Sequence, residues 1–146
     1  MFIIGRSNDN VYQYSLSIPW ELNTASYDNI SFSINGQDTN PRSVHFKPDG
    51  TKMFMLGLGS KRVHQYTLTT PWNLLSASYD FVSLGIWSEE TQPQSVHFRA
   101  DGTKMFILGN AGSNDSVHQY TLSTPWDINT ASYDSISFSI NPTQFK

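Results

Sequence analysis

The sequence of 146 residues has no cysteine and few charged residues. Without cysteine there is no disulfide, no thiolate nucleophile and no zinc–thiolate site. Charged residues make up 14% and the net charge is −3, so we expect no nucleic-acid partner and no binding to an anionic membrane. No apolar run approaches the roughly 20 residues of a membrane helix. No signal peptide is visible, because the first residues already resemble a strand. A secreted, surface or virion location is compatible with this composition.

What the chain does have is an internal repeat, which constrains the fold more than any other feature. A Pro-Trp pair recurs about every 52 residues, ending at Trp20, Trp72 and Trp126. The block Phe46–Phe54 returns as Phe98–Phe106. A third copy is split between the two ends: the chain stops at Phe-Lys and starts at Met-Phe-Ile-Ile-Gly, which matches Met-Phe-Met-Leu-Gly inside the chain.

Each repeat contains four short runs that favour β-strands. In the second copy they cover residues 43–46, 52–56, 63–68 and 79–86. The runs are rich in β-branched and aromatic residues and show stretches of period-two alternation. Between the first two runs, Lys-Pro-Asp-Gly is typical of a hairpin turn, with a glycine at Gly50 for the positive φ. The sequence therefore predicts an all-β fold with four antiparallel strands in each repeat.

The segment Val-His-Phe-Lys-Pro-Asp-Gly-Thr-Lys-Met-Phe-Met-Leu-Gly, at 44–57, resembles the blade motif of YVTN/lactonase-like β-propellers, which are related to WD40 proteins. The pattern Gln-Tyr-Thr-Leu-Ser-Thr-Pro-Trp-Asp, at 119–127, resembles tandem repeats of uncharacterised bacterial, phage and marine environmental proteins. The resemblance implies a β-propeller with three blades in this chain. Blade 1 would be 1–34 with the strand 142–146, blade 2 would be 41–86, and blade 3 would be 93–140.

Three blades are too few to close a propeller ring. An open arc would expose two apolar sheet faces and an unpaired strand edge, which favours association. We therefore expect a homodimer that closes a six-bladed ring, in which each C-terminal strand pairs beside the partner's first strand. A nine-bladed trimer and a fragment of a longer array are the alternatives. The residues expected to carry assembly are Met1, Phe2, Ile3, Ile4 and Phe145.

The three copies differ mainly in the loops between second and third strands and in the linkers between blades. In propellers these segments share one face, so a binding face there is one interpretation and simple drift is the other. Trp87 has no counterpart in the other copies, and it could stack on a sugar ring or on a partner's apolar group, or plug the seam between blades. The ligand-binding candidates are Arg6, Asn8, Asp9, Lys61, Arg62, Trp87, Glu89, Asn114 and Asp115.

His45 and His97 lie on the first strands, which line the channel of a propeller. Converging imidazoles are weak candidates for a metal site, and ordinary packing is the alternative. The repeated tryptophans are expected to pack between blades.

The sequence contains no G-x-S-x-G, phosphate-loop or H-E-x-x-H motif. We therefore predict a non-enzymatic recognition module without a cofactor, which binds a carbohydrate or a protein. A structural repeat segment is the second hypothesis, and a propeller-type hydrolase is the third.

Overall fold

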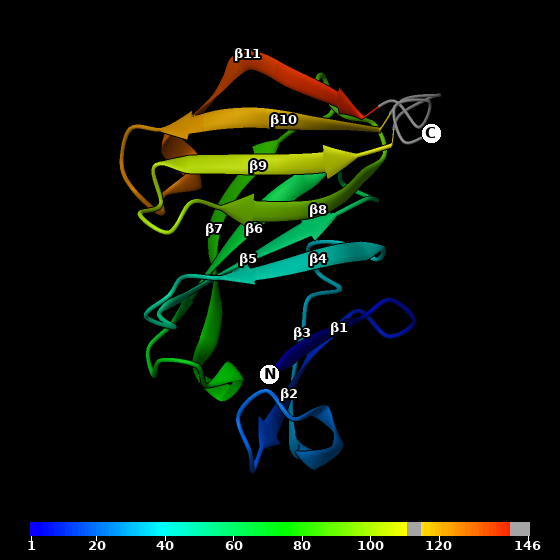
Figure 1. Cartoon of the computed structure of the whole chain (residues 1–146), viewed down its shortest axis with the longest axis vertical. Helices are drawn as coiled ribbons and strands as arrows, with labels where there is room; N and C mark the ends of the chain where they lie inside the picture. The colour runs from blue at the N-terminus through cyan, green and yellow to red at the C-terminus, as the bar shows by residue number, and fades with distance from the viewer. Residues whose placement is uncertain (111–114, 141–146) are drawn as a thin grey trace.

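The computed structural model describes residues 1–110 and 115–140, which fold into three antiparallel sheets in strand orders β1-β2-β3, β4-β5-β6-β7 and β8-β9-β10-β11 (Figure 1). The expected first strand of blade 1, residues 142–146, lies outside the described residues. The strands are β1 Phe2–Gly5, β2 Asn10–Leu16, β3 Ala25–Ser33, β4 Pro41–Phe46, β5 Lys52–Gly57, β6 Arg62–Leu68, β7 Ala77–Gly85, β8 Pro93–Phe98, β9 Lys104–Gly109, β10 Asp115–Leu122 and β11 Ala131–Ile140. Short 3-10 turns precede the outer strands: η1 Leu22–Thr24, η2 Leu74–Ser76 and η3 Ile128–Thr130.

The sheets follow one another along the long axis, so that the first sheet (β1–β3) lies at one end and the third sheet (β8–β11) at the other (Figure 1). The strands β1, β4 and β8 contact one another in sequence and form the inner side of the arc. Among the residues described, no helix is long and apolar enough to cross a membrane.

The hairpin turns after β4 and β8 are built as the Asp-Gly pattern predicts. Gly50 and Gly102 adopt φ of 74° and 75°, which favours glycine. Asp49 Oδ1 accepts hydrogen bonds from both the backbone nitrogen and the hydroxyl of Thr51, at 3.0 and 2.6 Å. The hydrogen bond from Lys47, followed by the two from Thr51, lowers the pKa of Asp49 to about 2. Asp101 accepts the same two hydrogen bonds from Thr103, at 3.0 and 2.7 Å, so the shared Asp-Gly-Thr sequence forms the same turn twice.

Each outer hairpin carries the same irregularity in its register. The pairing shifts directly after Gln13, Gln65 and Gln119. On the facing strand one residue in each copy adopts positive φ, as in a β-bulge. Those residues are Asn29, Phe81 and Ser135.

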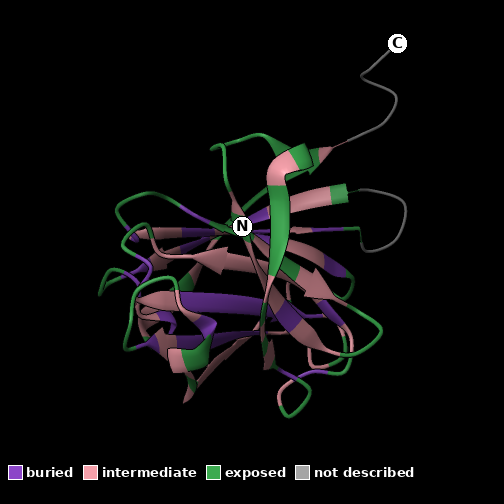
Figure 2. Cartoon of the chain, turned by 90° about the horizontal axis from the view of Figure 1, so that it is seen from below, coloured by how far each residue is buried: buried purple, intermediate pink, exposed green. Residues whose placement is uncertain are grey.

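Two apolar cores lie between neighbouring sheets, and Figure 2 shows the buried residues concentrated inside the arc. The core between the first and second sheets is built around Val11, Ile34, Met53, Met55, Tyr66, Leu68 and Leu74. The core between the second and third sheets is built around Phe54, Leu56, Val63, Ile86, Val96, Phe98, Met105, Ile107, Tyr120, Leu122, Trp126 and Ile128. The faces of the end sheets that point away from these cores stay uncovered.

Candidate functional site

A polar group recurs at the outer hairpin of each sheet. In the second sheet Asp80 Oδ2 accepts hydrogen bonds from Gln65 Nε2 at 2.8 Å and from Thr67 Oγ1 at 3.0 Å. Lys52 Nζ lies 3.4 Å from both Asp80 Oδ2 and Thr67 Oγ1. The lysine comes from β5, the glutamine and threonine from β6, and the aspartate from β7, so the group ties three strands together.

The third sheet repeats this group with shorter contacts to the lysine. Lys104 Nζ lies 2.6 Å from Thr121 Oγ1 and 2.9 Å from Asp134 Oδ2. Gln119 Nε2 donates to the same carboxylate oxygen at 2.7 Å. Hydrogen bonds from Thr121, Gln119 and Lys104 together lower the pKa of Asp134 to about 2. The carboxylate is therefore held in its charged form by its neighbours.

The glutamine of this group also joins one sheet to the next. Gln13 Oε1 accepts the backbone N–H of Leu74 at 3.1 Å, and Gln65 Oε1 accepts that of Ile128 at 3.1 Å. Leu74 and Ile128 begin η2 and η3, and both are fully buried. Within the residues that the structure describes, Gln119 Oε1 has no such donor.

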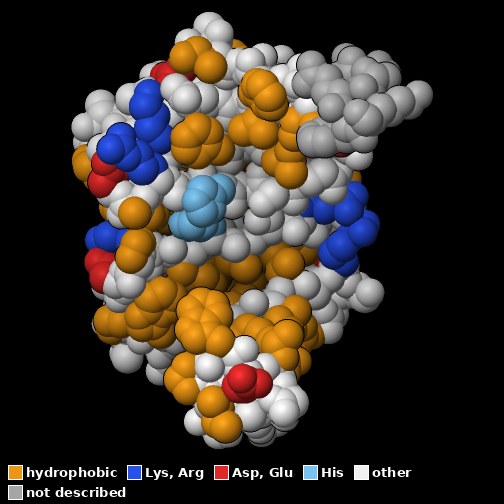
Figure 3. Space-filling view, in the orientation of Figure 1, with side chains coloured by type: hydrophobic (Ala, Val, Ile, Leu, Met, Phe, Trp, Pro, Cys, Tyr) orange, Lys and Arg blue, Asp and Glu red, His pale blue; other side chains and the backbone are white. Residues whose placement is uncertain are grey.

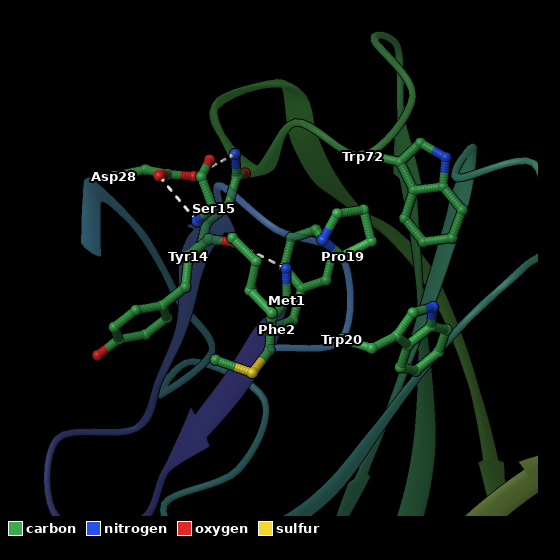
Figure 4. A pocket seen from close by; sticks show the side chains of 10 residues that line it. Met1, Phe2, Tyr14, Ser15, Pro19, Trp20, Asp28 and Trp72 are labelled. Atoms are coloured by element: carbon green, nitrogen blue, oxygen red, sulfur yellow. Dashed lines mark hydrogen bonds between the residues drawn. The ribbon is translucent and has the colours of Figure 1, made fainter. Parts of the chain in front are cut away.

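In the first sheet the same polar group opens into a cavity of about 580 Å³ (Figure 4). Gln13 Nε2 donates to Asp28 Oδ2 at 3.1 Å, and the backbone nitrogen of Ser15 donates to Asp28 Oδ1 at 3.0 Å. The position that the lysine holds in the other sheets would precede Met1, whose ammonium donates to the carbonyl of Tyr14 at 2.7 Å. The cavity is lined by Met1, Phe2, Gln13, Tyr14, Ser15, Leu16, Pro19, Trp20, Asp28 and Trp72.

Described parts of the variable loops contact the linkers: the backbone nitrogen of Leu58 donates to the carbonyl of Asn40 at 3.0 Å, and that of Asn110 donates to the carbonyl of Gln92 at 3.1 Å. The guanidinium of Arg62 lies 4.8 Å from the ring centre of Trp87, a cation–π contact. Arg62 Nη1 also donates to Ser83 Oγ at 3.0 Å. The indole of Trp87 lies against Gly85, where a side chain would collide with it, and about half of it stays exposed.

The remaining candidates are spread out and mainly hold loops. Arg6 Nη2 contacts Asn40 Oδ1 at 3.4 Å, and the amide of Asn8 contacts the hydroxyl of Tyr12. Asp9 and Lys61 occupy equivalent loop positions with φ of 51° and 50°. Their carbonyl groups accept the backbone N–H groups of Ile34 and Ile86. Asp115 begins β10 and is exposed, whereas Asn114 lies outside the described residues.

Asp38, a linker carboxylate that is not among the predicted site residues, binds the loop between β5 and β6 to the linker before β4. Asp38 is buried and accepts N–H groups from Asn40 at 2.6 Å, Gly59 at 3.3 Å and Ser60 at 2.6 Å. Burial raises the pKa of Asp38, but the hydrogen bonds, with that from Ser60 the largest, outweigh burial and lower it.

The corresponding linker between the second and third sheets uses two glutamates. Glu90 accepts the N–H of Gln92 at 2.6 Å and faces His118 Nε2 at 3.6 Å. Glu89, a predicted ligand residue, accepts the hydroxyl of Tyr120 at 3.3 Å. The sequence does carry a signal for the linker carboxylates: Asp38 precedes β4 at the same distance at which Glu90 precedes β8.

His45 and His97 lie side by side on β4 and β8, with ring centres 5.0 Å apart and planes at 86°. In the view of Figure 3, histidine side chains lie near the middle of the molecule, with hydrophobic side chains above and below them. Burial and then the neighbouring His97 lower the pKa of His45 to about 4. In the part of the chain that the structure describes, no three His, Cys, Asp or Glu side chains gather closely enough to hold a metal ion.

Comparison with solved structures identifies the fold. The chain is similar to a protein of unknown function from Desulfotomaculum acetoxidans, with 17% identity, a TM-score of 0.60 and coverage of 93% of this chain and 37% of that one. It is also similar to a "putative 6-phosphogluconolactonase" from Bacteroides fragilis, with 9% identity, a TM-score of 0.63, and coverage of 96% of this chain and 36% of that one. The fold is β-propeller-like.

A third structure, a "putative 6-phosphogluconolactonase" from Bacteroides uniformis, matches with 14% identity, a TM-score of 0.54 and coverage of 91% of this chain and 37% of that one. The chain thus spans little more than a third of the length of these propellers. No protein family matches the chain, and no curated protein matches it.

One sequence-based prediction needs correction. We predicted that the chain is not an enzyme, because no catalytic motif is recognisable. This is contradicted by the two propellers from Bacteroides, which carry the name of an enzyme. The absence of a local motif does not exclude catalysis, because one fold hosts many unrelated activities.

The exposure of each repeated tryptophan depends on how much of the neighbouring blade packs against it. Trp126 is 7% exposed, because it packs over Gly102 of its own blade and against Phe54 of the preceding one. Trp72 packs over Gly50 and is 43% exposed. Trp20, which has no preceding blade and no turn beneath it among the described residues, is 96% exposed.

The expected assembly residues divide between the two faces of β1. Phe2 stacks on Phe46 with ring centres 4.2 Å apart, and Ile4 packs on the first core. Met1 and Ile3 are exposed on the opposite face. Phe145 lies outside the described residues.

Proposed function

We propose that two copies of this chain associate end to end into a six-bladed propeller ring and that the ring serves as a recognition module. Association is supported by apolar residues that are exposed on the end sheets, although the equivalent residues of the other sheets are buried between blades. The residues Met1, Ile3 and Leu22 are exposed on the first sheet, whereas their counterparts in both other sheets are buried inside the cores. In the second and third sheets this face is covered by the preceding sheet, and on the first sheet a second copy of the chain could cover it.

The outer face of the third sheet is the matching half. Ile136 and Phe138 are exposed there, whereas Val82 and Leu84 at the equivalent positions of the second sheet pack on the core. On the same face, no donor among the described residues contacts Oε1 of Gln119, and Leu22 at the start of η1 has the N–H that would match it. The contact between sheets is thus available a third time, between the two ends of the arc.

The test of this association is the mass in solution. We expect light scattering to give twice 16.5 kDa over a wide range of protein concentration. A monomer of 16.5 kDa at all concentrations would overturn the ring, and three times that mass would replace it by the nine-bladed trimer.

For recognition, the loop edge with Trp87 is the surface we propose for a carbohydrate or a protein. The indole packs against Arg62 and Gly85, yet about half of the residue faces solvent. An exposed aromatic ring that packs on neighbouring side chains is well suited to stack on a sugar ring or to anchor a protein contact.

We expect Trp87→Ala to abolish binding of any glycan that the parent protein retains on a glycan array. Leu75→Ala is the matched control, because Leu75 is also exposed but lies on η2 at the far edge of the same sheet. Equal binding by parent and Trp87→Ala, whether to a glycan or to an isolated protein partner, would refute this assignment.

A further inference from the structure

We propose that Asn35 is a site of spontaneous modification, at which the side-chain amide is lost and a mixture of aspartate and isoaspartate forms. Asn35 lies in the linker between β3 and β4, and it is the only asparagine of the sequence that is followed by glycine. The proposal depends neither on ring formation nor on recognition at the loop edge.

The reaction needs only the side chain of Asn35, the next backbone nitrogen and water. The nitrogen of Gly36 loses its proton and attacks Cγ of Asn35, and the C–N bond of the side-chain amide breaks. The departing nitrogen takes up a proton and leaves as ammonia, and the new bond closes a five-membered succinimide. Water opens this ring at one carbonyl to give aspartate and at the other to give isoaspartate. Glycine favours the attack because it has no Cβ atom to hinder the approach or restrict the backbone.

The linker leaves both reacting groups accessible. Asn35 and Gly36 are exposed, and a Cβ atom at Gly36 would meet nothing within 4 Å. Among the described residues, no acceptor binds the N–H of Gly36 and no hydrogen bond holds the side chain of Asn35. The chain is held on both sides of the pair, because Ile34 is buried and the hydroxyl of Tyr66 donates to Gln37 Oε1 at 3.2 Å.

The Asp-Gly turns of the same chain show the opposite arrangement. Asp-Gly pairs can close the same succinimide with loss of water, but the nitrogen of Gly50 donates to the carbonyl of Lys47 at 2.8 Å. The carboxylate of Asp49 accepts two hydrogen bonds from Thr51. The second turn repeats these bonds. The structure therefore distinguishes Asn35 from two pairs of similar sequence in which both reacting groups are bound.

The modification would change the linker in two ways. It adds a negative charge at the position that Trp87 holds in the next linker. Isoaspartate also lengthens the main chain by one carbon, ahead of Asp38, whose carboxylate holds the loop between β5 and β6.

We would incubate the whole protein at neutral and mildly alkaline pH and follow the tryptic peptide of residues 7–42 by mass spectrometry. We expect its mass to rise by one unit, with the change located at Asn35 by fragmentation and with both isoaspartate and aspartate as products. The rate should rise with pH, because the nitrogen of Gly36 attacks only after it loses its proton.

Gly36→Ala tests the route and should slow the conversion about tenfold, because the added Cβ hinders the attack. Asn73 is the internal control: leucine follows it, and its side chain accepts the N–H of Leu75 at 3.0 Å, so it should stay unchanged in the same sample. The proposal is overturned if Asn35 of the folded protein converts no faster than Asn73, if aspartate forms without isoaspartate, or if Gly36→Ala converts as fast as the parent.

Discussion

At the scale of single residues, one buried and one partly buried histidine contribute to the pH dependence of stability. Burial lowers the pKa of His64 from 6.5 to about 4, and burial with His97 does the same for His45. The unfolded chain therefore takes up protons below about pH 6.5 that the folded chain binds only near pH 4. Because the unfolded state binds more protons in this window, the free energy of unfolding should fall as the pH drops from 6.5 to 4.

Urea unfolding at a series of pH values measures this slope. His64→Phe removes one titrating group while keeping a ring, and Tyr12 holds the equivalent place in the first sheet, so the slope should be clearly smaller in the variant. Carboxylates with a lowered pKa, such as Asp49, begin to lose their contribution at about pH 5 and so add to the slope in parent and variant alike. The difference between the two slopes therefore isolates His64. An identical slope for parent and variant would contradict the assignment.

Residue roles in the site were harder to predict than the strands. Lys52 and Asp80 lie far apart in the sequence, and only the bulge after Gln65 brings their side chains together. The register skips two residues of β7 at this point, Asp80 and Phe81, which a pattern of short strands does not indicate. Asp38 was missed for another reason: it lies in a linker that differs between copies, although its hydrogen bonds hold the next loop in place.

At the scale of elements, the hairpin turns were predictable because their chemistry is local. Gly50 has φ of 74°, and a Cβ atom there would lie 2.5 Å from the Trp72 indole. Gly50→Ala should therefore lower the free energy of unfolding by about 1–3 kcal/mol, through backbone strain and displacement of the indole. Gly36→Ala is the control, since a Cβ atom there meets nothing within 4 Å. Chemical denaturation of both variants measures the difference, and equal losses would show that the turn is not strained.

At the scale of the whole molecule, the three sheets have similar sequences and strand orders, but equivalent residues differ in how far neighbouring sheets bury them. The sequence predicted three equivalent tryptophans between blades, yet their exposure runs from 7% to 96%. Local sequence cannot indicate this difference, because it depends on which neighbouring sheet is present. An exposed residue whose counterparts are buried between sheets can therefore be mutated to test whether a second chain covers it.

Leu22 and Leu75 form a matched pair for this test. Both are exposed leucines on 3-10 turns, at 71% and 73%. The counterparts of Leu22, Leu74 and Ile128, are buried between sheets, whereas the counterparts of Leu75 are asparagines. If the ring forms as proposed, Leu22→Asp should place a charge in the new contact and shift the mass toward 16.5 kDa, while Leu75→Asp should leave the dimer intact. Equal behaviour of the two variants would show that any dimer uses another surface.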